Sequence, residues 1–252
     1  MKAPKVLDDL RQLKKITAAR IGLPRAGTSI ATSEMLLFDL DHARARDAVH
    51  LAFNAEEVIQ QLQFRQLNTV QVQSAVKTRT LYLQRPDLGR QLDEHSKNKL
   101  LEIAKQQIQV PDLAIIIADG LSTRAIHENA IPLLNYFLPK VVSHNWNMAP
   151  IIVAHQARVA LADEVGELLQ AKLSIILIGE RPGLSADNSM GAYITFSPHN
   201  GCTDAERNCI SNIRQGGLGY IEAATQLEQL ITSSFKLGLS GVKLKDHKTL
   251  IA

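Results

Sequence analysis

Apolar residues in the first third of the chain recur at helical intervals. Three stretches have this spacing, at residues 6–22, 32–52 and 55–67. Gly22 and Pro24 are typical of a helix end and close the first of them. The pattern therefore predicts an N-terminal helical region, which we assign to residues 1–80.

The pattern changes near residue 80, where short apolar runs begin to alternate with helical stretches. These runs lack the strict alternation of a half-buried strand, which favours a parallel sheet covered on both faces. We therefore predict an α/β fold over residues 81–252: a Rossmann-like parallel sheet with helices on both faces, preceded by a small N-terminal helical domain. A short extended piece is also expected at residues 81–84, and a helix from about Tyr220 closes the chain. The predicted strands contain the sequences "LAIII", "PIIVA", "LSIILIG" and "AYITFS".

Two carboxylates come directly after predicted strands. Asp119 follows one apolar run, and Glu180 follows another in the segment "LIGERPGL". Right-handed crossovers bring the carboxyl ends of parallel strands to one edge of the sheet, where open α/β folds bind ligands. Glu180 and Arg181 therefore have two interpretations. One is a salt bridge or cap that fixes a loop stiffened by Pro182, and the other is a contact with a ligand.

The composition is that of a folded chain with little net charge. The chain has 252 residues, of which 45% are hydrophobic, and its 28 basic and 25 acidic residues leave a net charge of +3. This balance does not favour nucleic-acid binding. No apolar stretch reaches the roughly 20 residues that cross a bilayer, and the N-terminus lacks the apolar core of a secretory signal. We expect a soluble, cytoplasmic protein with reduced cysteines and no nucleic-acid or membrane partner.

Common catalytic and ligand motifs are absent from the sequence. It has no G-x-x-x-x-G-K-[ST] loop, no G-x-G-x-x-G after a strand and no H-E-x-x-H. Cys202 and Cys209 do not form a zinc spacing, and a small buried hydrophobe is the default expectation for Cys209. The segment "DEHSKN" is close to the D-x-H-x-x-G loop that ligates cobalt in some B12 proteins, but Asn98 replaces the glycine. We therefore expect His95 to be an exposed helix residue and expect no metal ligands.

Several longer blocks, taken together, resemble the small (light) subunit of ethanolamine ammonia-lyase. They include "IADGLSTRAIHENAIPLL", "LIGERPGLSADNSMGAYITFSP" and "TDAERNCISNIRQGG". The similarity extends from about residue 20 to the C-terminal end. The resemblance implies a subunit of a carbon–nitrogen lyase (EC 4.3.1.7) that converts ethanolamine to acetaldehyde and ammonia in ethanolamine degradation.

The resemblance also implies a cofactor and a partner. In this family a large barrel-shaped chain binds ethanolamine and carries out the radical chemistry. Adenosylcobalamin lies between that large subunit and the small one. A hexamer of heterodimers, enclosed in a bacterial microcompartment, is a further expectation. The family keeps the cofactor's own base on cobalt, which agrees with the incomplete "DEHSKN" loop, and no catalytic residue is expected in this chain.

Three residues correspond to the family's cofactor contacts: Val159 in "ARVAL", Glu180 in "GERPG" and Cys209 before "ISNI". The resemblance assigns these roles, and the side chains suit them. A fixed carboxylate accepts hydrogen bonds from the amide groups around a corrin. Valine offers apolar contact, and cysteine offers a small surface or a weak polar contact. Ala157 and Ala162 replace glycines that are common around this valine, and we expect a slight shift of its loop.

Two other functions stay open from the residues alone. One is a free-standing α/β enzyme for a small phosphorylated or carboxylated ligand, with Asp119 and Glu180 as acid–base groups. It would need no partner. The other is a purely structural subunit that assembles the large chain and leaves its cofactor affinity unchanged.

Overall fold

The computed structural model describes residues 16–17 and 19–244. The helix predicted over residues 6–22 therefore lies mostly outside the described residues. The other two predicted helices of the first third are present, as α2 (Thr32–His50) and α3 (Ala55–Gln63). A two-stranded hairpin, β1 (Arg25–Ala26) and β2 (Ser29–Ile30), precedes α2.

From residue 69 onward, strands alternate with helices, as the apolar pattern predicts. The strands are β3 (Thr69–Gln73), β4 (Leu113–Ala118), β5 (Ile151–His155), β6 (Leu173–Gly179), β7 (Met190–Phe196) and β8 (Arg207–Ile213). The helices are α4 (Arg79–Gln84), α5 (Glu94–Gln106), α6 (Thr123–Ser143), α7 (Leu161–Leu168) and α8 (Tyr220–Leu237), with short 3-10 turns η1 (Leu88–Arg90) and η2 (Asp204–Glu206).

The six strands from β3 to β8 form one sheet in the order β3-β5-β4-β6-β7-β8. β3, β5, β4 and β6 are parallel, whereas β7 is antiparallel to both β6 and β8. The α/β class is confirmed, but the prediction of a parallel sheet is wrong at this end. The reason is the connection from β6 to β7. Residues 180–189 contain no helix, and a return to a parallel strand needs a longer crossover, usually a helix.

Two strands and one helix differ from the sequence-based prediction. β3 and β8 were not predicted, and both lie at the edges of the sheet, where polar residues alternate with apolar ones. Residues 81–84, predicted to be extended, belong to α4. The side chain of Thr78 caps this helix by accepting a hydrogen bond from the backbone N–H of Leu81 at 3.3 Å.

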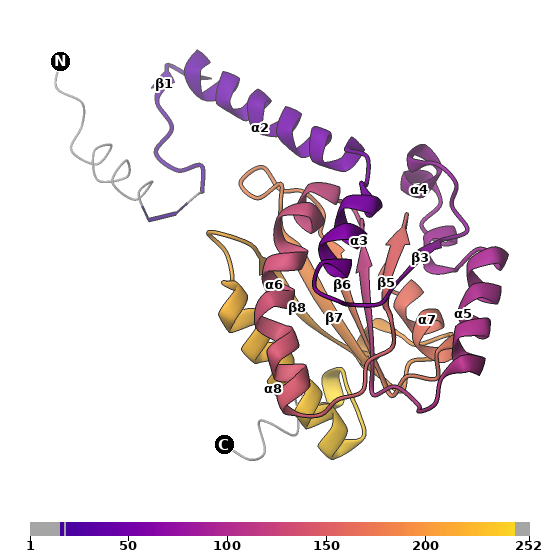
Figure 1. The fold of residues 1–252 in the computed structure, drawn as a ribbon. Coiled ribbons are helices and arrows are strands. Elements are labelled where there is room, and N and C mark those ends of the chain that lie inside the picture. The colour runs from indigo at the N-terminus through magenta and orange to yellow at the C-terminus, as the bar shows by residue number, and fades with distance from the viewer. Residues whose placement is uncertain (1–15, 18, 245–252) are drawn as a thin grey trace.

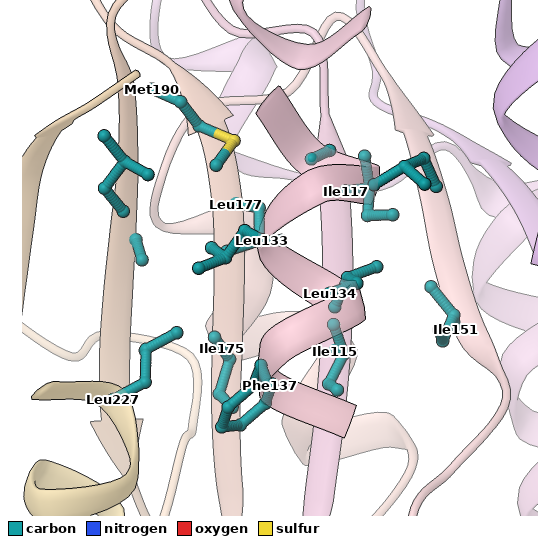
Figure 2. Packing of buried hydrophobic residues seen from close by; sticks show 14 of the residues in the cluster. Ile115, Ile117, Leu133, Leu134, Phe137, Ile151, Ile175, Leu177, Met190 and Leu227 are labelled. Carbon is teal, nitrogen blue, oxygen red and sulfur yellow. The ribbon is translucent and has the colours of Figure 1, made fainter. Parts of the chain in front are cut away.

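Helices cover both faces of the sheet (Figure 1). α3, α6 and α8 pack on one face, and α5 and α7 pack on the other. Residues of β4 alternate between the two layers, since Ile115 and Ile117 belong to the first and Ile116 to the second. Figure 2 shows the first layer, where Leu134 and Phe137 of α6 lie against the strands. Fully burying one such side chain contributes about 1.5–3 kcal/mol.

The second layer is incomplete over one end of the sheet. Its buried residues come from β3, β4, β5 and β6 and from α5 and α7, and none comes from β8. On this face, Tyr193 of β7 is only partly buried and Cys209 of β8 is exposed. The face of β7 and β8 is therefore open around Tyr193 and Cys209, whereas α7 covers the start of β8, where Arg207 is buried against Asp163.

The helix α2 extends away from the rest of the chain (Figure 1). All of its residues are described, and Ala48 is its single buried residue. Several large apolar side chains of α2 are exposed: Met35 by 53%, Leu36 by 63%, Leu37 by 54% and Leu40 by 44%. An apolar surface of this kind is typical of a segment that contacts another molecule.

Candidate functional site

The three residues predicted to contact a ligand lie on three different segments. Val159 is in the loop between β5 and α7, Glu180 directly follows β6, and Cys209 lies within β8. Val159 and Glu180 are partly buried and Cys209 is exposed. The expectation of a buried Cys209 is wrong, because β8 points Cys209 to the uncovered face while Ile210 packs in the opposite core layer.

Tyr193, which sequence reasoning missed, connects these residues. It is opposite Cys209 in the pairing of β7 with β8, and its hydroxyl hydrogen-bonds the Cys209 thiol. Burial raises the pKa of Tyr193 above its ordinary value, and the neighbouring Cys209 and Glu180 add to this shift. Tyr193 therefore stays neutral. Together with Val159 it lines a cleft on the uncovered face of the sheet.

A signal for Tyr193 was present in the strand sequence "MGAYITF". Ala192 and Ile194 point into the first core layer, so the tyrosine between them must point to the other face of the sheet. The signal was missed because it depends on knowing that no helix covers this part of the other face.

The cleft has a volume of about 570 Å³, which lies within the usual range for ligand pockets. Its floor and walls come from the α4–η1 connection, the Val159 loop, β7 and the segment before β8. The lining residues are Pro86, Arg90, Arg158, Val159, Ala160, Tyr193, Cys202, Thr203, Asp204 and Arg207.

Glu180 holds the end of β6 in place and at the same time presents a carboxylate. Its backbone N–H donates to the carbonyl of Ser189 at 2.9 Å. Its Oε2 accepts hydrogen bonds from the Ser189 hydroxyl and from the backbone N–H of Asn212, the latter at 3.2 Å. The loop-fixing interpretation of Glu180 is therefore realised. Arg181 is exposed.

Gly191 leaves room for this arrangement. A Cβ atom at this position would lie 2.9 Å from Oε1 of Glu180 and 3.0 Å from the ring of Tyr193. Both distances are too short for ordinary contact, so a side chain at residue 191 would displace one group or the other. The missing side chain allows Glu180 and Tyr193 to approach the same point.

The Val159 loop is fixed by contacts from several segments. Tyr82 donates from its hydroxyl to the carbonyl of Ala157 at 3.0 Å, and the backbone N–H of Arg158 donates to the carbonyl of Gly89 at 2.7 Å. The Arg158 guanidinium lies 4.1 Å above the centre of the Tyr82 ring, a geometry that favours a cation–π interaction. These contacts present Val159 from a rigid loop.

Asp119, the other carboxylate that follows a strand, fixes the same loop from beneath. Its side chain is 1% exposed. It accepts hydrogen bonds from the backbone N–H groups of Gly120, Gln156 and Ala157 at 2.9, 2.9 and 3.1 Å. Arg79 lies 3.7 Å away. Burial raises the pKa of Asp119 to about 6, although these donors and Arg79 oppose the shift.

These positions confirm one geometric prediction and argue against another. Asp119 and Glu180 do follow neighbouring parallel strands, since Ala118 pairs with Ile178. However, neither carboxylate is among the residues that line the cleft, and the Asp119 oxygens are occupied by backbone donors. An acid–base pair of Asp119 and Glu180 is therefore not supported. His95 is an exposed residue of α5, as predicted.

A buried ion pair supports the wall of the cleft. Arg207 contacts the carboxylate of Asp163, and both side chains are less than 5% exposed, at 4% and 3%. Arg207 also donates to the carbonyl of Cys202 at 2.7 Å and to Asp204 at 2.7 Å. The pair fixes the segment before β8. Its partners are 44 residues apart, so no local sequence pattern predicts it.

Among residues 16–17 and 19–244, no helix combines the length and the apolar character that crossing a bilayer requires.

A family model described as "Ethanolamine ammonia-lyase light chain (EutC)" matches residues 7–245. The chain is 46% identical to the ethanolamine ammonia-lyase small subunit of Azotobacter vinelandii, over 98% of this chain and 91% of the relative. It is 48% identical to the small subunit of Pseudomonas putida strain W619, over 93% and 86%. With the small subunit of Xanthomonas campestris pv. campestris strain B100 it shares 48% identity, over 95% and 88%. The chain therefore belongs to the family of ethanolamine ammonia-lyase light chains.

Proposed function

We propose that the chain is the small subunit of an adenosylcobalamin-dependent ethanolamine ammonia-lyase and completes the cofactor site at the interface with a large catalytic subunit. Its family identifies it as a subunit of a lyase (EC 4.3.1.7), which converts ethanolamine to acetaldehyde and ammonia. The observation that carries the cofactor proposal is the open face around Tyr193. Val159 and Tyr193 line its cleft, Cys209 pairs with Tyr193 across β7 and β8, and Glu180 and the Tyr193 ring both approach Gly191.

The residues on this face fit the rim of a corrin ring. A corrin combines an apolar macrocycle with a ring of amide side chains, so it needs apolar surface together with a few hydrogen-bonding groups. Val159 and Tyr193 supply apolar surface, and the carboxylate of Glu180 supplies a hydrogen-bond acceptor. A cleft of about 570 Å³ on one face of the chain suits part of a bulky ligand, the rest of which a second chain would enclose.

The chain's own residues bind and orient the cofactor and carry no chemical step. When bound, adenosylcobalamin supplies the radical chemistry by homolysis of its cobalt–carbon bond. Glu180 is held by Ser189 and Asn212, so it can accept from a corrin amide without first losing conformational freedom. Cys209 is small, and its hydrogen bond with Tyr193 keeps the thiol beside the tyrosine hydroxyl. No protein ligand to cobalt is needed from this chain.

The proposed partner is the large subunit, and α2 is the proposed element of contact. Its exposed apolar residues would be buried by a second chain. In this proposal the N-terminal helical region, residues 1–80, faces the partner. The Rossmann-like α/β region, residues 81–252, faces cobalamin. A hexamer of heterodimers inside a bacterial microcompartment is the assembly that the family resemblance implies.

Reconstitution tests this proposal. The chain is purified alone and together with a large subunit, and each preparation is incubated with adenosylcobalamin. We expect ethanolamine-dependent ammonia release, and the visible spectrum of a protein-bound corrin, from the two-chain sample. Activity from this chain alone would favour the free-standing enzyme. Equal corrin affinity of the large subunit with and without this chain would favour a purely structural role.

A substitution tests the assigned contact. Glu180→Gln keeps the size of the side chain and removes its charge, so a charge-assisted hydrogen bond worth about 1.5–3 kcal/mol is weakened or lost. We expect the complex to bind cobalamin roughly 10- to 100-fold more weakly. Glu102→Gln, at an exposed residue of α5, is the matched control and should keep the wild-type affinity. Wild-type affinity in Glu180→Gln would remove Glu180 from the site.

A further inference from the structure

The segment between β7 and β8, residues 197–206, brings together three side chains that can bind a metal ion. One ligand atom from each of His199, Cys202 and Glu206 lies within 4.8 Å of the others. Among the described residues, no other group of three or more His, Cys, Asp or Glu side chains has its ligand atoms this close together. Cys202 also lines the cleft, whereas His199 and Glu206 line a neighbouring pocket. We propose that these three residues form a Zn²⁺ site.

The distances suit a tetrahedral metal ion. Zn²⁺ lies about 2.3 Å from a cysteine sulfur and about 2.0–2.1 Å from a histidine nitrogen, so two such ligands are separated by roughly 3.5 Å. The Sγ of Cys202 is 3.9 Å from Nε2 of His199. The same sulfur lies closer to Nδ1 of His199, at 3.3 Å, so the imidazole must rotate to turn Nε2 toward an ion that Sγ also binds.

One contact of the histidine favours the tautomer that this role needs. Its Nδ1 lies 3.0 Å from the carbonyl oxygen of Ser197, so the proton on Nδ1 can be donated to that oxygen, which leaves Nε2 as the free ligand atom. A histidine that ligates zinc usually donates its other ring N–H to a carbonyl or a carboxylate in this way. The tautomer that the metal requires is therefore the one that this contact favours.

The other two ligands are held by contacts that do not involve the metal. Glu206 accepts at one carboxylate oxygen from the backbone N–H and the hydroxyl of Thr203, at 2.7 and 2.9 Å. These bonds orient the carboxylate and leave its second oxygen as a ligand. The carbonyl of Cys202 accepts from Arg207 at 2.7 Å, so the buried Arg207 pair fixes the backbone at the cysteine.

The donor set selects the metal. A thiolate, an imidazole and a carboxylate suit Zn²⁺ or Co²⁺, whereas Mg²⁺ and Ca²⁺ require oxygen ligands. Three protein ligands leave a fourth position for water. The two negative charges of Cys202 and Glu206 would neutralise Zn²⁺. The bound ion would join His199, Cys202 and Glu206 and so stiffen the wall of the cleft.

Metal binding is measured on the purified full-length chain with Zn²⁺ and with Co²⁺ as a coloured substitute. We expect one equivalent of metal per chain, and a Co²⁺ spectrum with tetrahedral d–d bands and a thiolate charge-transfer band. Cys202→Ser should remove the charge-transfer band and, like His199→Asn, should weaken metal binding by at least roughly tenfold. His95→Asn, at an exposed histidine of α5, is the control and should bind as the wild type does.

The two cysteines of the chain provide an independent readout. Zn²⁺ should slow alkylation of Cys202 by at least roughly tenfold and leave alkylation of Cys209 unchanged, as measured by mass spectrometry of each peptide. The proposal is overturned if no stoichiometric metal binds, or if the Co²⁺ band survives Cys202→Ser. Metal binding and alkylation are both measured without cobalamin or the large subunit. Their results therefore do not depend on the proposed lyase function.

Discussion

Asp119 and Glu180 occupy equivalent places after neighbouring strands, yet burial gives them different roles. Asp119 is almost fully enclosed and accepts from three backbone N–H groups. Glu180 is partly exposed, and its Oε1 lies beside Gly191 near the ring of Tyr193. The sequence predicted both positions, because an apolar run followed by a polar residue marks a strand end. It did not predict which carboxylate is buried, since that depends on Arg79 and the Val159 loop, which are distant in the chain.

The burial of Asp119 leads to a prediction about stability and pH. Burial raises the pKa of Asp119 from 3.8 to about 6, so the folded state binds this proton more tightly than the unfolded state. The resulting stabilisation is complete below pH 3.8 and is lost as the pH rises through 6. The loss is on the order of 3 kcal/mol. Asp119→Asn lacks this titration. At pH 4, where the wild-type side chain is protonated, we expect the variant to be less stable by about 1–3 kcal/mol, because an amide N–H₂ replaces one acceptor.

Urea unfolding of both proteins from pH 4 to pH 7 measures this. The stability advantage of the wild type over Asp119→Asn should shrink as the pH rises through this window. An advantage that grows with pH would mean that the three N–H donors and Arg79 outweigh burial, and that the pKa is lowered.

Gly191 provides a second test at the residue scale. Gly191→Ala places a methyl group 2.9 Å from Glu180 Oε1, so the carboxylate must move. If Glu180 contacts the cofactor, the two-chain complex should bind cobalamin roughly 10- to 100-fold more weakly, which corresponds to losing a charged hydrogen bond. Gly219→Ala is the control, because its nearest contact is 4.0 Å away. Equal affinities in both variants would show that the Glu180 position is not critical.

At the scale of elements, the sequence predicted the strands that are buried on both faces and missed the two strands at the edges of the sheet. β4, β5 and β6 are continuous apolar runs, because helices cover both of their faces. β3 and β8 alternate polar and apolar residues at the edges of the sheet, and this short pattern does not distinguish a strand from a loop. Only the family resemblance therefore assigns Cys209 to the site, because the apolar pattern does not predict its strand.

The helix α2 gives a prediction at the element scale. Leu36 and Leu40 are four residues apart and therefore lie on one face of the helix. The double substitution Leu36→Gln and Leu40→Gln should weaken co-purification with a large subunit by tenfold or more, since burying one leucine contributes about 1.5–3 kcal/mol. It should also reduce self-association of the isolated chain in analytical ultracentrifugation. Leu101→Gln, at a 41% exposed residue of α5, is the control. Unchanged co-purification would exclude α2 from the interface.

At the scale of the whole molecule, the site depends on how the sheet ends. Because β7 turns back directly from β6, no crossover helix is available to cover Tyr193 and Cys209 on the α5–α7 side, where α7 reaches only the start of β8 at Arg207. The antiparallel end, which the apolar pattern did not reveal, is therefore what leaves a sheet face open for a ligand. The same parallel strands also need the N-terminal part of the chain, since β3 pairs with β5 and α3 packs in the first core layer.

This packing predicts where the chain can be cut. The division between residues 1–80 and 81–252 stays a prediction, and a truncation tests it. A chain that begins at residue 81 loses α3 and β3, so it exposes the edge of β5 and the core residues beneath α3, and we expect it to aggregate. A chain that begins at residue 52 keeps both elements and should unfold cooperatively in urea, with stability within about 2 kcal/mol of the full chain because α2 buries almost nothing. If the chain that begins at residue 81 unfolds cooperatively, residues 81–252 form an independent unit.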